Sequence, residues 1–502
     1  MRFLYSLLAI TIIIIISSLS SCRKDFSTVP SFGKLQFSKD TVFLDTIFTN
    51  IGSATYNLKV YNRSSKAITI PEIKLKNGVS SNYRLNVDGV PGKEFQNVDI
   101  LAKDSIFIFV ETTIDFNNVP DPLYTDQILF DNGENEQDVD LVTLVQDANF
   151  IFPSKNSMGI ETLVIDGKQT EIQGRFLTDS ELTFTDEKPY VIYGYVAVPS
   201  DKTLTIEAGA KIHFHRNSGL IIDKKATLKA NGTLDNKITF EGDRLEHSFS
   251  NIPGQWGTIW MRAGSDNSEL NHAIIKNGII GVLVDSIGSN TNPTLSIKNT
   301  EIYNNSSYGI LGRQANILGE NLVIGNTGQA SLAATIGGTY NFTHCTFANY
   351  WVNSFRDLPA VVVNNHFTYT NSANQEITET RDLHAANFIN CIIEGNNNVE
   401  FVLDKVDGSS FNYMIENSMI QFEDPNNTFA NNNELDFNDA SHYQNIILNG
   451  TPNFRDVNKN DFIIGTESDA INKAKATSIS LDILGTNRSI NPDLGAYQHI
   501  TF

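Results

Sequence analysis

Cysteine is scarce in this sequence, and its scarcity excludes one class of secreted protein. The chain has 502 residues and only 3 cysteines. Small secreted scaffolds that depend on disulfides carry far more cysteine per residue. Hydrophobic cores must therefore stabilise the chain, and its length favours two or three domains.

Positive charge is also in short supply. The chain has 37 Lys and Arg residues against 57 Asp and Glu residues, which gives a formal net charge of −20 at pH 7. Nucleic acids and anionic membrane surfaces attract basic proteins, so we expect neither to be an electrostatic partner. Disorder is excluded too, because 40% of the residues are hydrophobic and only 19% are charged.

Long apolar runs are missing after the first residues of the chain. The run at residues 3 to 16 follows Arg2 and precedes the small residues 17 to 21, which is the pattern of a secretory signal peptide. The run is shorter than the about 20 residues of a membrane-spanning helix. The alternative to the lipoprotein signal described next is an ordinary signal peptide followed by a chance cysteine.

The sequence Leu19-Ser20-Ser21-Cys22 resembles a bacterial lipobox, in which the cysteine thiol is acylated and the signal is then removed. The resemblance implies that residues 1–21 are a lipoprotein signal peptide and that lipid on Cys22 anchors the chain to a membrane. Residues 22–33 are polar and aperiodic, so we expect a lipidated tether. The charged residues 23 to 25 partly resemble the signals of surface lipoproteins. They favour an outer-membrane protein on the cell surface, with a periplasm-facing orientation as the alternative.

Residues 34–150 contain short alternating runs separated by turn residues. This pattern predicts an antiparallel β-sandwich, and segments 59–64 and 101–105 resemble the Ig-like domains of bacterial surface proteins. We interpret the acidic stretch 131–140 as a hairpin turn, with a calcium loop as the alternative. The predicted strands are 41–44, 56–60, 67–70, 105–110, 127–130 and 139–142.

Residues 160–502 repeat. Six runs rich in Ile, Val and Phe align so that their third residues are separated by 27, 22, 23, 46 and 27 positions. A repeat of this length indicates a solenoid, and the lack of a 3.6-residue period argues against helical returns. We therefore predict a right-handed parallel β-helix with these residues inside its bore. The six residues are Ile275, Ile302, Ile324, Phe347, Ile393 and Ile420.

Two further expectations follow from this repeat. The 46-residue step is interpreted as one coil with a polar insertion at 366–382, which makes Cys345 and Cys391 neighbours in the stack. We favour reduced, buried thiols, with a disulfide as the alternative. Asparagines at one corner are expected to form a ladder of side-chain hydrogen bonds, namely Asn277, Asn304, Asn326 and Asn349.

Both ends of the repeat region carry motifs of a known fold. Residues 204–209, Leu-Thr-Ile-Glu-Ala-Gly, and residues 492–498, Pro-Asp-Leu-Gly-Ala-Tyr-Gln, resemble the opening and closing segments of bacterial β-helix proteins with the pectin-lyase-like fold. With the lipobox and the sandwich, the chain resembles a group of Gram-negative envelope lipoproteins that have an N-terminal Ig-like domain. The resemblance implies an all-β fold and an envelope location, and it names no substrate.

The sequence contains few residue patterns that would support catalysis or metal binding. Glycoside cleavage needs paired carboxylates, and only Asp404 and Asp407 are close together in the sequence. His213 and His215 alternate on one predicted strand without a third metal ligand nearby. We therefore assign no catalytic residue, metal or cofactor, and keep a β-helix polysaccharide lyase or glycoside hydrolase as the alternative. The candidate acids are Asp285, Glu301, Glu320, Asp357, Asp404 and Asp407.

The segment 242–260 holds two of the 3 tryptophans. Tryptophan and arginine on an extended loop are typical of sugar stacking or of a protein-binding hot spot. The alternative is that both tryptophans cover the edge of a coil. The sequence thus predicts a lipid-anchored module that binds a glycan or an envelope protein. Its candidate binding residues are Asp243, Arg244, Glu246, His247, Trp256 and Trp260.

Overall fold

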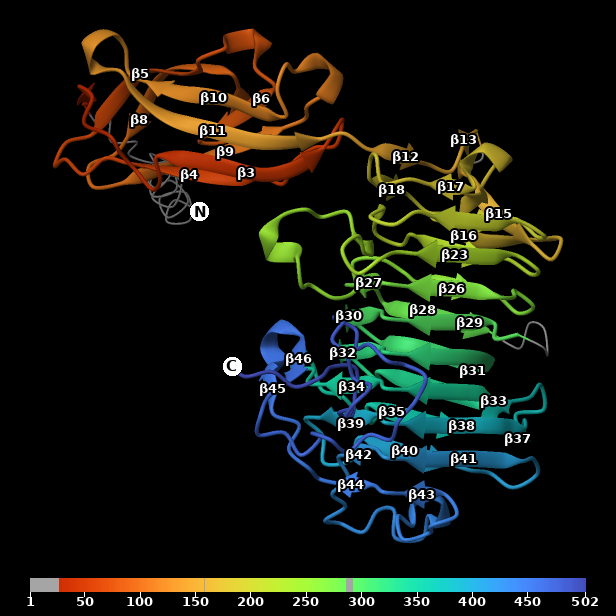
Figure 1. The fold of residues 1–502 in the computed structure, drawn as a ribbon. Helices are drawn as coiled ribbons and strands as arrows, with labels where there is room; N and C mark the ends of the chain where they lie inside the picture. Colours follow the sequence, from red (N-terminus) through yellow and green to blue (C-terminus); the bar gives the residue numbers. More distant parts are fainter. Residues whose placement is uncertain (1–26, 158, 286–291) are drawn as a thin grey trace, which may run out of the picture. The chain divides into compact units, whose positions relative to one another are not determined.

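The computed structural model describes residues 27–157, 159–285 and 292–502. The signal peptide and the predicted lipidation site Cys22 lie outside the described residues. The chain divides after Gln146 into two compact units, each with its own core (Figure 1). Among the described residues, all regular secondary structure is β-strand or short 3-10 helix.

The first unit packs two β-sheets against one hydrophobic core. The first sheet has the order β1-β5-β10-β11-β3, with β8 also paired to β5, and the second has the order β2-β4-β9-β6-β7. The strands of the first sheet are β1 (Val29–Pro30), β5 (Ile68–Leu75), β10 (Leu123–Phe130), β11 (Gln137–Gln146), β3 (Thr41–Phe48) and β8 (Glu94–Ile100). Those of the second are β2 (Gln36–Phe37), β4 (Tyr56–Tyr61), β9 (Ser105–Thr112), β6 (Tyr83–Val87) and β7 (Val90–Gly92).

Alternation builds this sandwich as the sequence predicts, but the pairing is not antiparallel throughout, because β11 pairs with β3 and β1 pairs with β5 in parallel. In β9, Ile106, Ile108 and Val110 are buried, while the residues between them face solvent. Strands β10 and β11 form an antiparallel hairpin across the acidic stretch, closed by a 3-10 turn at Gly133–Asn135. Strand β1 pairs with β5 inside the stretch predicted as a tether, so the sheet begins earlier than predicted.

The second unit consists of stacked coils whose equivalent strands pair in parallel, an arrangement compatible with a β-helix (Figure 1). The first parallel sheet has the order β12-β18-β21-β24-β27-β30-β32-β34-β39-β42-β44. Its strands are β12 (Asn149–Ile151), β18 (Tyr190–Ile192), β21 (Lys211–Phe214), β24 (Ile238–Gly242), β27 (Ala273–Lys276), β30 (Glu301–Asn305), β32 (Val323–Thr327), β34 (Thr346–Asn349), β39 (Ile392–Gly395), β42 (Met419–Ile420) and β44 (Ile447–Leu448).

Two more parallel sheets complete each coil. The second parallel sheet contains β16 (Lys168–Phe176), β19 (Tyr195–Val198), β22 (Gly219–Ile222), β25 (Ile259–Met261), β28 (Ile280–Asp285), β31 (Tyr308–Glu320), β33 (Leu332–Thr343), β35 (Val361–Asn364) and β40 (Phe401–Asp404). The third contains β17 (Thr183–Phe184), β20 (Thr203–Ile206), β23 (Thr227–Asn231), β26 (Ser268–Asn271), β29 (Leu295–Lys298), β38 (Leu383–Ile389), β41 (Phe411–Glu416) and β43 (Tyr443–Gln444). The long strands β31 and β33 run through both.

The predicted register of the coils is confirmed residue by residue. Each of the six aligned residues lies opposite the next one in the first parallel sheet, and all are fully buried. Strand β34 pairs directly with β39, although the hairpin of β36 (His366–Thr370) and β37 (Glu376–Thr380) lies between these two strands in the sequence. The 46-residue step is therefore one coil with an insertion.

The asparagine ladder is not where the sequence placed it. Asn277 and Asn304 adopt left-handed φ values of 66° and 53° and bond to the loop at Ser250 and Asn251 rather than to each other. The left-handed turn directs their amides away from the neighbouring coil. A ladder does form at the opposite end of these strands, where the amides of Asn271, Asn299 and Asn321 are joined by hydrogen bonds of 2.9 Å each.

The C-terminal segment covers part of the outer face of the first parallel sheet. It includes β45 (Phe454–Asp456) and β46 (Asp461–Ile464) and lies beside β32 and β34 (Figure 1). Its buried side chains include Phe462 and Leu494, which pack against outward residues of the sheet. Within the described ranges, no helix is long and apolar enough to cross a membrane.

Candidate functional site

An apolar column runs along the outer face of the second parallel sheet. Side-chain direction alternates along a strand, so Val282 and Val284 point into the core while Leu283 between them points outward. In successive coils the outward residues lie directly opposite each other and, except for the buried Ala333, are half-buried. We define the apolar column as Trp260, Leu283, Leu311, Ala333, Val362 and Val402.

A charged column lies beside it, two residues further along each strand. Asp285 is opposite Arg313, with an ion pair of 2.5 Å between Oδ1 and Nε. Trp260 donates its indole N–H to the other oxygen of Asp285 at 2.8 Å, which ties the two columns together. Further down, Asn364 lies opposite Asp404.

The two columns open into a groove at β35 and β40. Three of the acids that are scattered in the sequence, Asp357, Asp404 and Asp407, line this groove together with Glu434. They meet because the insertion leaves β40 directly below β35, a placement that sequence spacing alone conceals. The other apolar and polar lining residues are Leu358, Pro359, Val362, Val402, Lys405, Thr428, Phe429 and Asn431 to Asn433.

Three charged groups of the groove, Lys405, Glu434 and Asp404, have partners. Lys405 donates to Glu434 at 2.9 Å, and this hydrogen bond raises the pKa of the Lys405 ammonium. The carboxylate of Asp404 lies 3.7 Å from Nε2 of His366. Of the remaining candidate acids, Glu301 pairs with Lys237 and Glu320 pairs with Lys298, both at 2.8 Å and both away from the groove.

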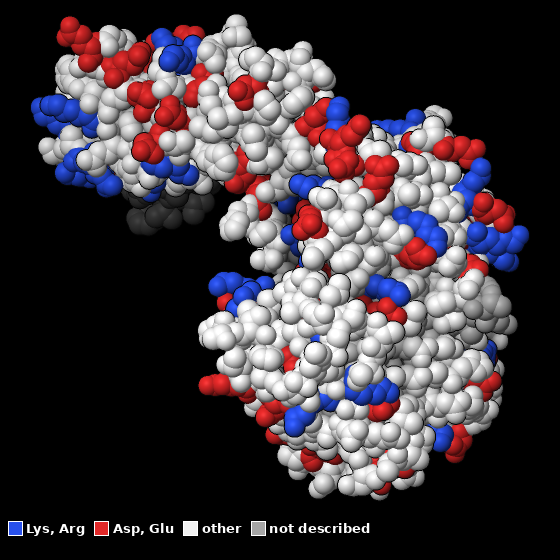
Figure 2. Space-filling model, viewed as in Figure 1, with Lys and Arg blue, Asp and Glu red and all other residues white. Residues whose placement is uncertain are grey.

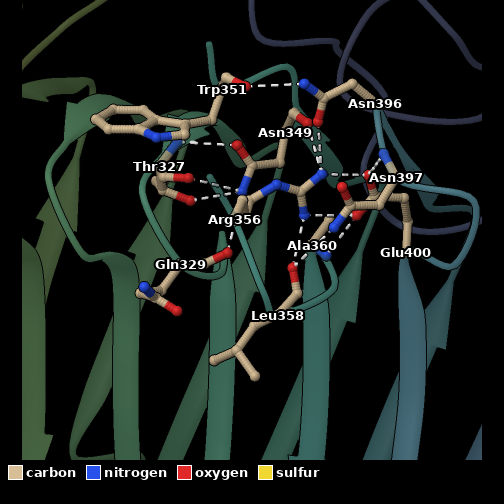
Figure 3. A network of polar contacts seen from close by, with 10 residues as sticks. All are labelled: Thr327, Gln329, Asn349, Trp351, Arg356, Leu358, Ala360, Asn396, Asn397 and Glu400. Atoms are coloured by element: carbon tan, nitrogen blue, oxygen red, sulfur yellow. Dashed lines mark hydrogen bonds and ion pairs between the residues drawn. The ribbon is translucent and has the colours of Figure 1, made fainter. Parts of the chain in front are cut away.

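One wall of the groove is the loop between β34 and β35, and a buried ion pair holds it (Figure 3). The side chains of Arg356 and Glu400 are 2% and 0% exposed. Arg356 also donates to the carbonyls of Leu358 and Asn349, and Glu400 accepts from the backbone N–H of Ala360 at 2.7 Å. The loop is therefore fixed at its base, since breaking such a pair would leave a buried charge.

The outer part of the same loop is exposed. Val352 and Phe355 are 79% and 85% exposed, although Trp351 and Arg356 beside them are buried. Near the base, burial and the charge of Glu400 raise the pKa of Glu394 to about 8. The loop thus combines a rigid, polar base with an apolar tip next to the groove.

The structure separates the residues that the sequence grouped in the loop 242–260. Trp256 is fully buried, stacks on Phe214 with ring centroids 4.5 Å apart and donates its indole N–H to Lys276 O at 2.9 Å. We therefore correct its assignment from binding residue to core residue, because the strand that follows the loop has already entered the coil at this position. Trp260 lies elsewhere, at the upper end of the apolar column.

The remaining loop residues do come together. Arg244 donates to the carboxylate of Glu246 and lies over the ring of Phe249 at 3.8 Å. Asp243 lies 2.7 Å from Nδ1 of His215, and His247 begins a 3-10 helix, His247–Phe249. Asp243, Arg244, Glu246 and His247 thus organise the loop itself.

Some functional features carried no signal in the sequence. Arg356 and Glu400 belong to different coils, and nothing in their neighbours marks them as a pair.

Cys345 and Cys391 are both free and buried, and the residues that follow them, Thr346 and Ile392, lie opposite each other. The inferred adjacency of the two thiols is therefore confirmed.

Charge on the visible face of the molecule is dispersed. Figure 2 shows Asp and Glu interspersed with Lys and Arg, with wide areas of uncharged surface between them. The net charge of −20 is thus not gathered into one patch on this face.

Comparisons with known proteins add little to this geometry. No family model matches the chain, and no curated protein matches it. A solved structure of a family 123 glycoside hydrolase from Clostridium perfringens, described in a study of glycolipid glycan hydrolysis, is similar at 13% identity with a TM-score of 0.17. The similarity covers 28% of this chain and 27% of that one, so the chain spans about a quarter of its length.

Proposed function

We propose that this protein is a lipid-anchored protein of the Gram-negative outer membrane, exposed on the cell surface, that binds or scaffolds a glycan or protein partner. In this proposal the first unit is an Ig-like domain and the coils form a right-handed β-helix. The observation that carries the binding role is the apolar column, which runs beside the charged column and ends in the groove. The lipid anchor is proposed from the sequence Leu19-Ser20-Ser21-Cys22 alone.

The shape of this surface suits a linear partner. Strands of neighbouring coils lie about 4.8 Å apart, so equivalent side chains repeat at short, regular intervals along the stack. Solenoids commonly use such extended surfaces for binding. The apolar column would contact apolar faces of the partner, while Asp285, Arg313 and Asp404 would meet its polar groups.

Binding is favoured over cleavage because two of the four carboxylates of the groove are engaged. Hydrolysis of a glycosidic bond needs one carboxyl as acid and another as base or nucleophile. Glu434 is bonded to Lys405, and Asp404 faces His366. A polysaccharide lyase or glycoside hydrolase is the competing function, and the gathering of Asp357, Asp404 and Asp407 in one groove is the observation that supports it.

One experiment compares binding and turnover in the same samples. The full-length protein is incubated with a panel of polysaccharides, and both retention and new reducing ends are measured. Val402→Lys places a charge on the groove floor and should abolish retention. Ile274→Lys makes the same change at an outward, half-buried position of β27 and should not. Release of products that Asp404→Asn abolishes would replace binding by catalysis, and unchanged retention by Val402→Lys would exclude the groove as the site.

The anchor is tested separately. Cys22→Ala removes the thiol that lipidation requires, so the variant should move from the membrane fraction to the soluble fraction. Digestion of intact cells by an external protease should degrade the wild-type protein if it faces outward. Retention of Cys22→Ala in the membrane would show that the lipoprotein assignment is wrong.

A further inference from the structure

A second surface with binding chemistry lies on the first unit. The outer face of β9 presents Phe107 and Phe109, which are 44% and 41% exposed although they stand in the middle strand of a sheet. Their ring planes are 15° apart and their centroids are 6.2 Å apart. Single exposed apolar side chains are normal, whereas contiguous apolar area with a polar rim is typical of binding surfaces.

Polar side chains surround the two rings. Strands β4 and β6 flank β9, and their register places Lys59 opposite Phe107 and places Asn57 and Asn86 opposite Phe109 on either side. Oδ1 of Asn86 is buried and has no hydrogen-bond partner within the described structure. Amide side chains beside an exposed ring can donate hydrogen bonds to, and accept them from, hydroxyl groups of a ligand.

Two cations lie on this aromatic surface. The ammonium of Lys59 is 5.1 Å from the ring centroid of Phe107 and 5.4 Å from that of Tyr61, and the guanidinium of Arg63 is 4.1 Å from Tyr61. In the parts of the chain that the structure describes, neither cation has a carboxylate within ion-pair distance.

We propose that this face is a binding site for an acidic polysaccharide, in addition to the groove on the coils. The rings of Phe107 and Phe109 would pack against the apolar faces of sugar units. Lys59 and Arg63 would pair with carboxylate or sulfate groups, because cations held over rings and free of acids attract anions. Asn57 and Asn86 would bond to hydroxyl groups.

The partner is an acidic glycan rather than a neutral one because of this charge pattern. Arg84, at the other end of the face, lies 3.8 Å from Glu111. Of the three cations Lys59, Arg63 and Arg84, the two beside the rings are therefore the ones without an ion pair among the described residues. The site belongs to the first unit and uses no residue of the groove. It is therefore independent of the proposed function of the coils.

The test uses the full-length protein with defined polymers. The probes are polygalacturonate and dextran sulfate, and their uncharged counterparts are methyl-esterified polygalacturonate and dextran. We expect retention of at least one charged polymer at low salt, weaker retention at high salt, and at least tenfold weaker retention of the uncharged form. Phe107→Ala with Phe109→Ala, and separately Lys59→Gln with Arg63→Gln, should each weaken binding at least tenfold.

Controls separate this site from general effects on the fold and from the groove. Phe43→Ala removes a similarly exposed phenylalanine, 51% exposed, from the other sheet of the same unit and should leave retention unchanged. Ile274→Lys, on the outer face of the first parallel sheet, should also leave it unchanged. No variant in this test alters a residue of the groove, so failure of the groove proposal would not affect this result. All variants are checked for wild-type melting.

Any of three outcomes would overturn the proposal: that neither charged polymer is retained, that the variants bind as the wild-type protein does, or that the uncharged counterparts bind equally well. Binding to vesicles that contain anionic phospholipid, without binding to the polymers, would assign the face to a membrane surface instead.

Discussion

The outer face of the first parallel sheet has an open part and a covered part, although the inner face is the same throughout. Inward residues from Phe240 to Ile420 form one buried apolar stack. In the open part, the outward residues Glu241 and Lys276 form an ion pair of 2.9 Å. In the covered part, the outward residues at the same register are Tyr303 and Gly325, which lie beneath the C-terminal segment.

This difference shows that inward and outward residues have separate structural roles. The inward stack stabilises the coils, whereas each outward residue determines which segment can pack on the outer face of its coil. Gly325 illustrates the point, because a Cβ atom there would lie 2.4 Å from the ring of Phe462. The same logic applies to the apolar column, whose outward side chains are left available for a partner.

The largest effect is expected from breaking the stack that both parts share. Ile324 is fully buried and lies between Ile302 and Phe347. An unpaired carboxylate at this position costs several kcal/mol, so Ile324→Asp should unfold the second unit, as followed by thermal melting. Thr239→Asp, at an outward position of the open part, should melt nearly as the wild-type protein does. Wild-type melting of Ile324→Asp would contradict the register.

A smaller effect is expected from uncovering the covered part. Phe462 is fully buried against Tyr303, with ring centroids 6.3 Å apart. Phe462→Ala should lower the free energy of unfolding by about 3 kcal/mol and should make residues after 450 sensitive to limited proteolysis. In the open part, Lys276→Ala should cost less than about 1 kcal/mol, as exposed ion pairs do. Equal effects of the two changes would remove the distinction between the two parts.

The smallest effect is a pH dependence of the covered part. Burial and Glu400 raise the pKa of Glu394 from 4.5 to about 8. Between these values the folded chain holds a proton that the unfolded chain has released, so stability falls as the pH rises through this window. Glu394→Gln should reduce that slope and gain roughly 1 to 3 kcal/mol at pH 8, measured by urea unfolding at pH 5, 7 and 8.5. Identical slopes for both proteins would show that Glu394 does not titrate in this range.

The periodic part of the fold was predictable from the sequence. Inward residues of a coil repeat at intervals of 22 to 27 positions, so Ile275, Ile302 and Ile324 reveal their own alignment. Alternation along short runs likewise identified most strands of the first unit. Both signals work because buried residues must recur with the geometry of the strand.

The outward surface could not be predicted in this way. Ala496 N–H bonds to the hydroxyl of Thr346, which is 150 positions earlier, and no repeat links the two residues. The acids of the groove come together only because one coil carries an insertion. Arg356 of one coil pairs with Glu400 of the next coil. Trp256 and Trp260 are near neighbours in the sequence, yet one is in the core and the other is on the apolar column.

The most direct test of the central claim, that the apolar column and groove hold the partner, is site-specific photo-crosslinking in intact cells. A photoreactive amino acid is placed at Val362, on the floor of the groove, or at Ile274, on the open part of the first parallel sheet. Our account predicts a crosslinked species of higher mass for Val362 and none for Ile274. Crosslinking at Ile274 alone, or equal crosslinking at both positions, would contradict it.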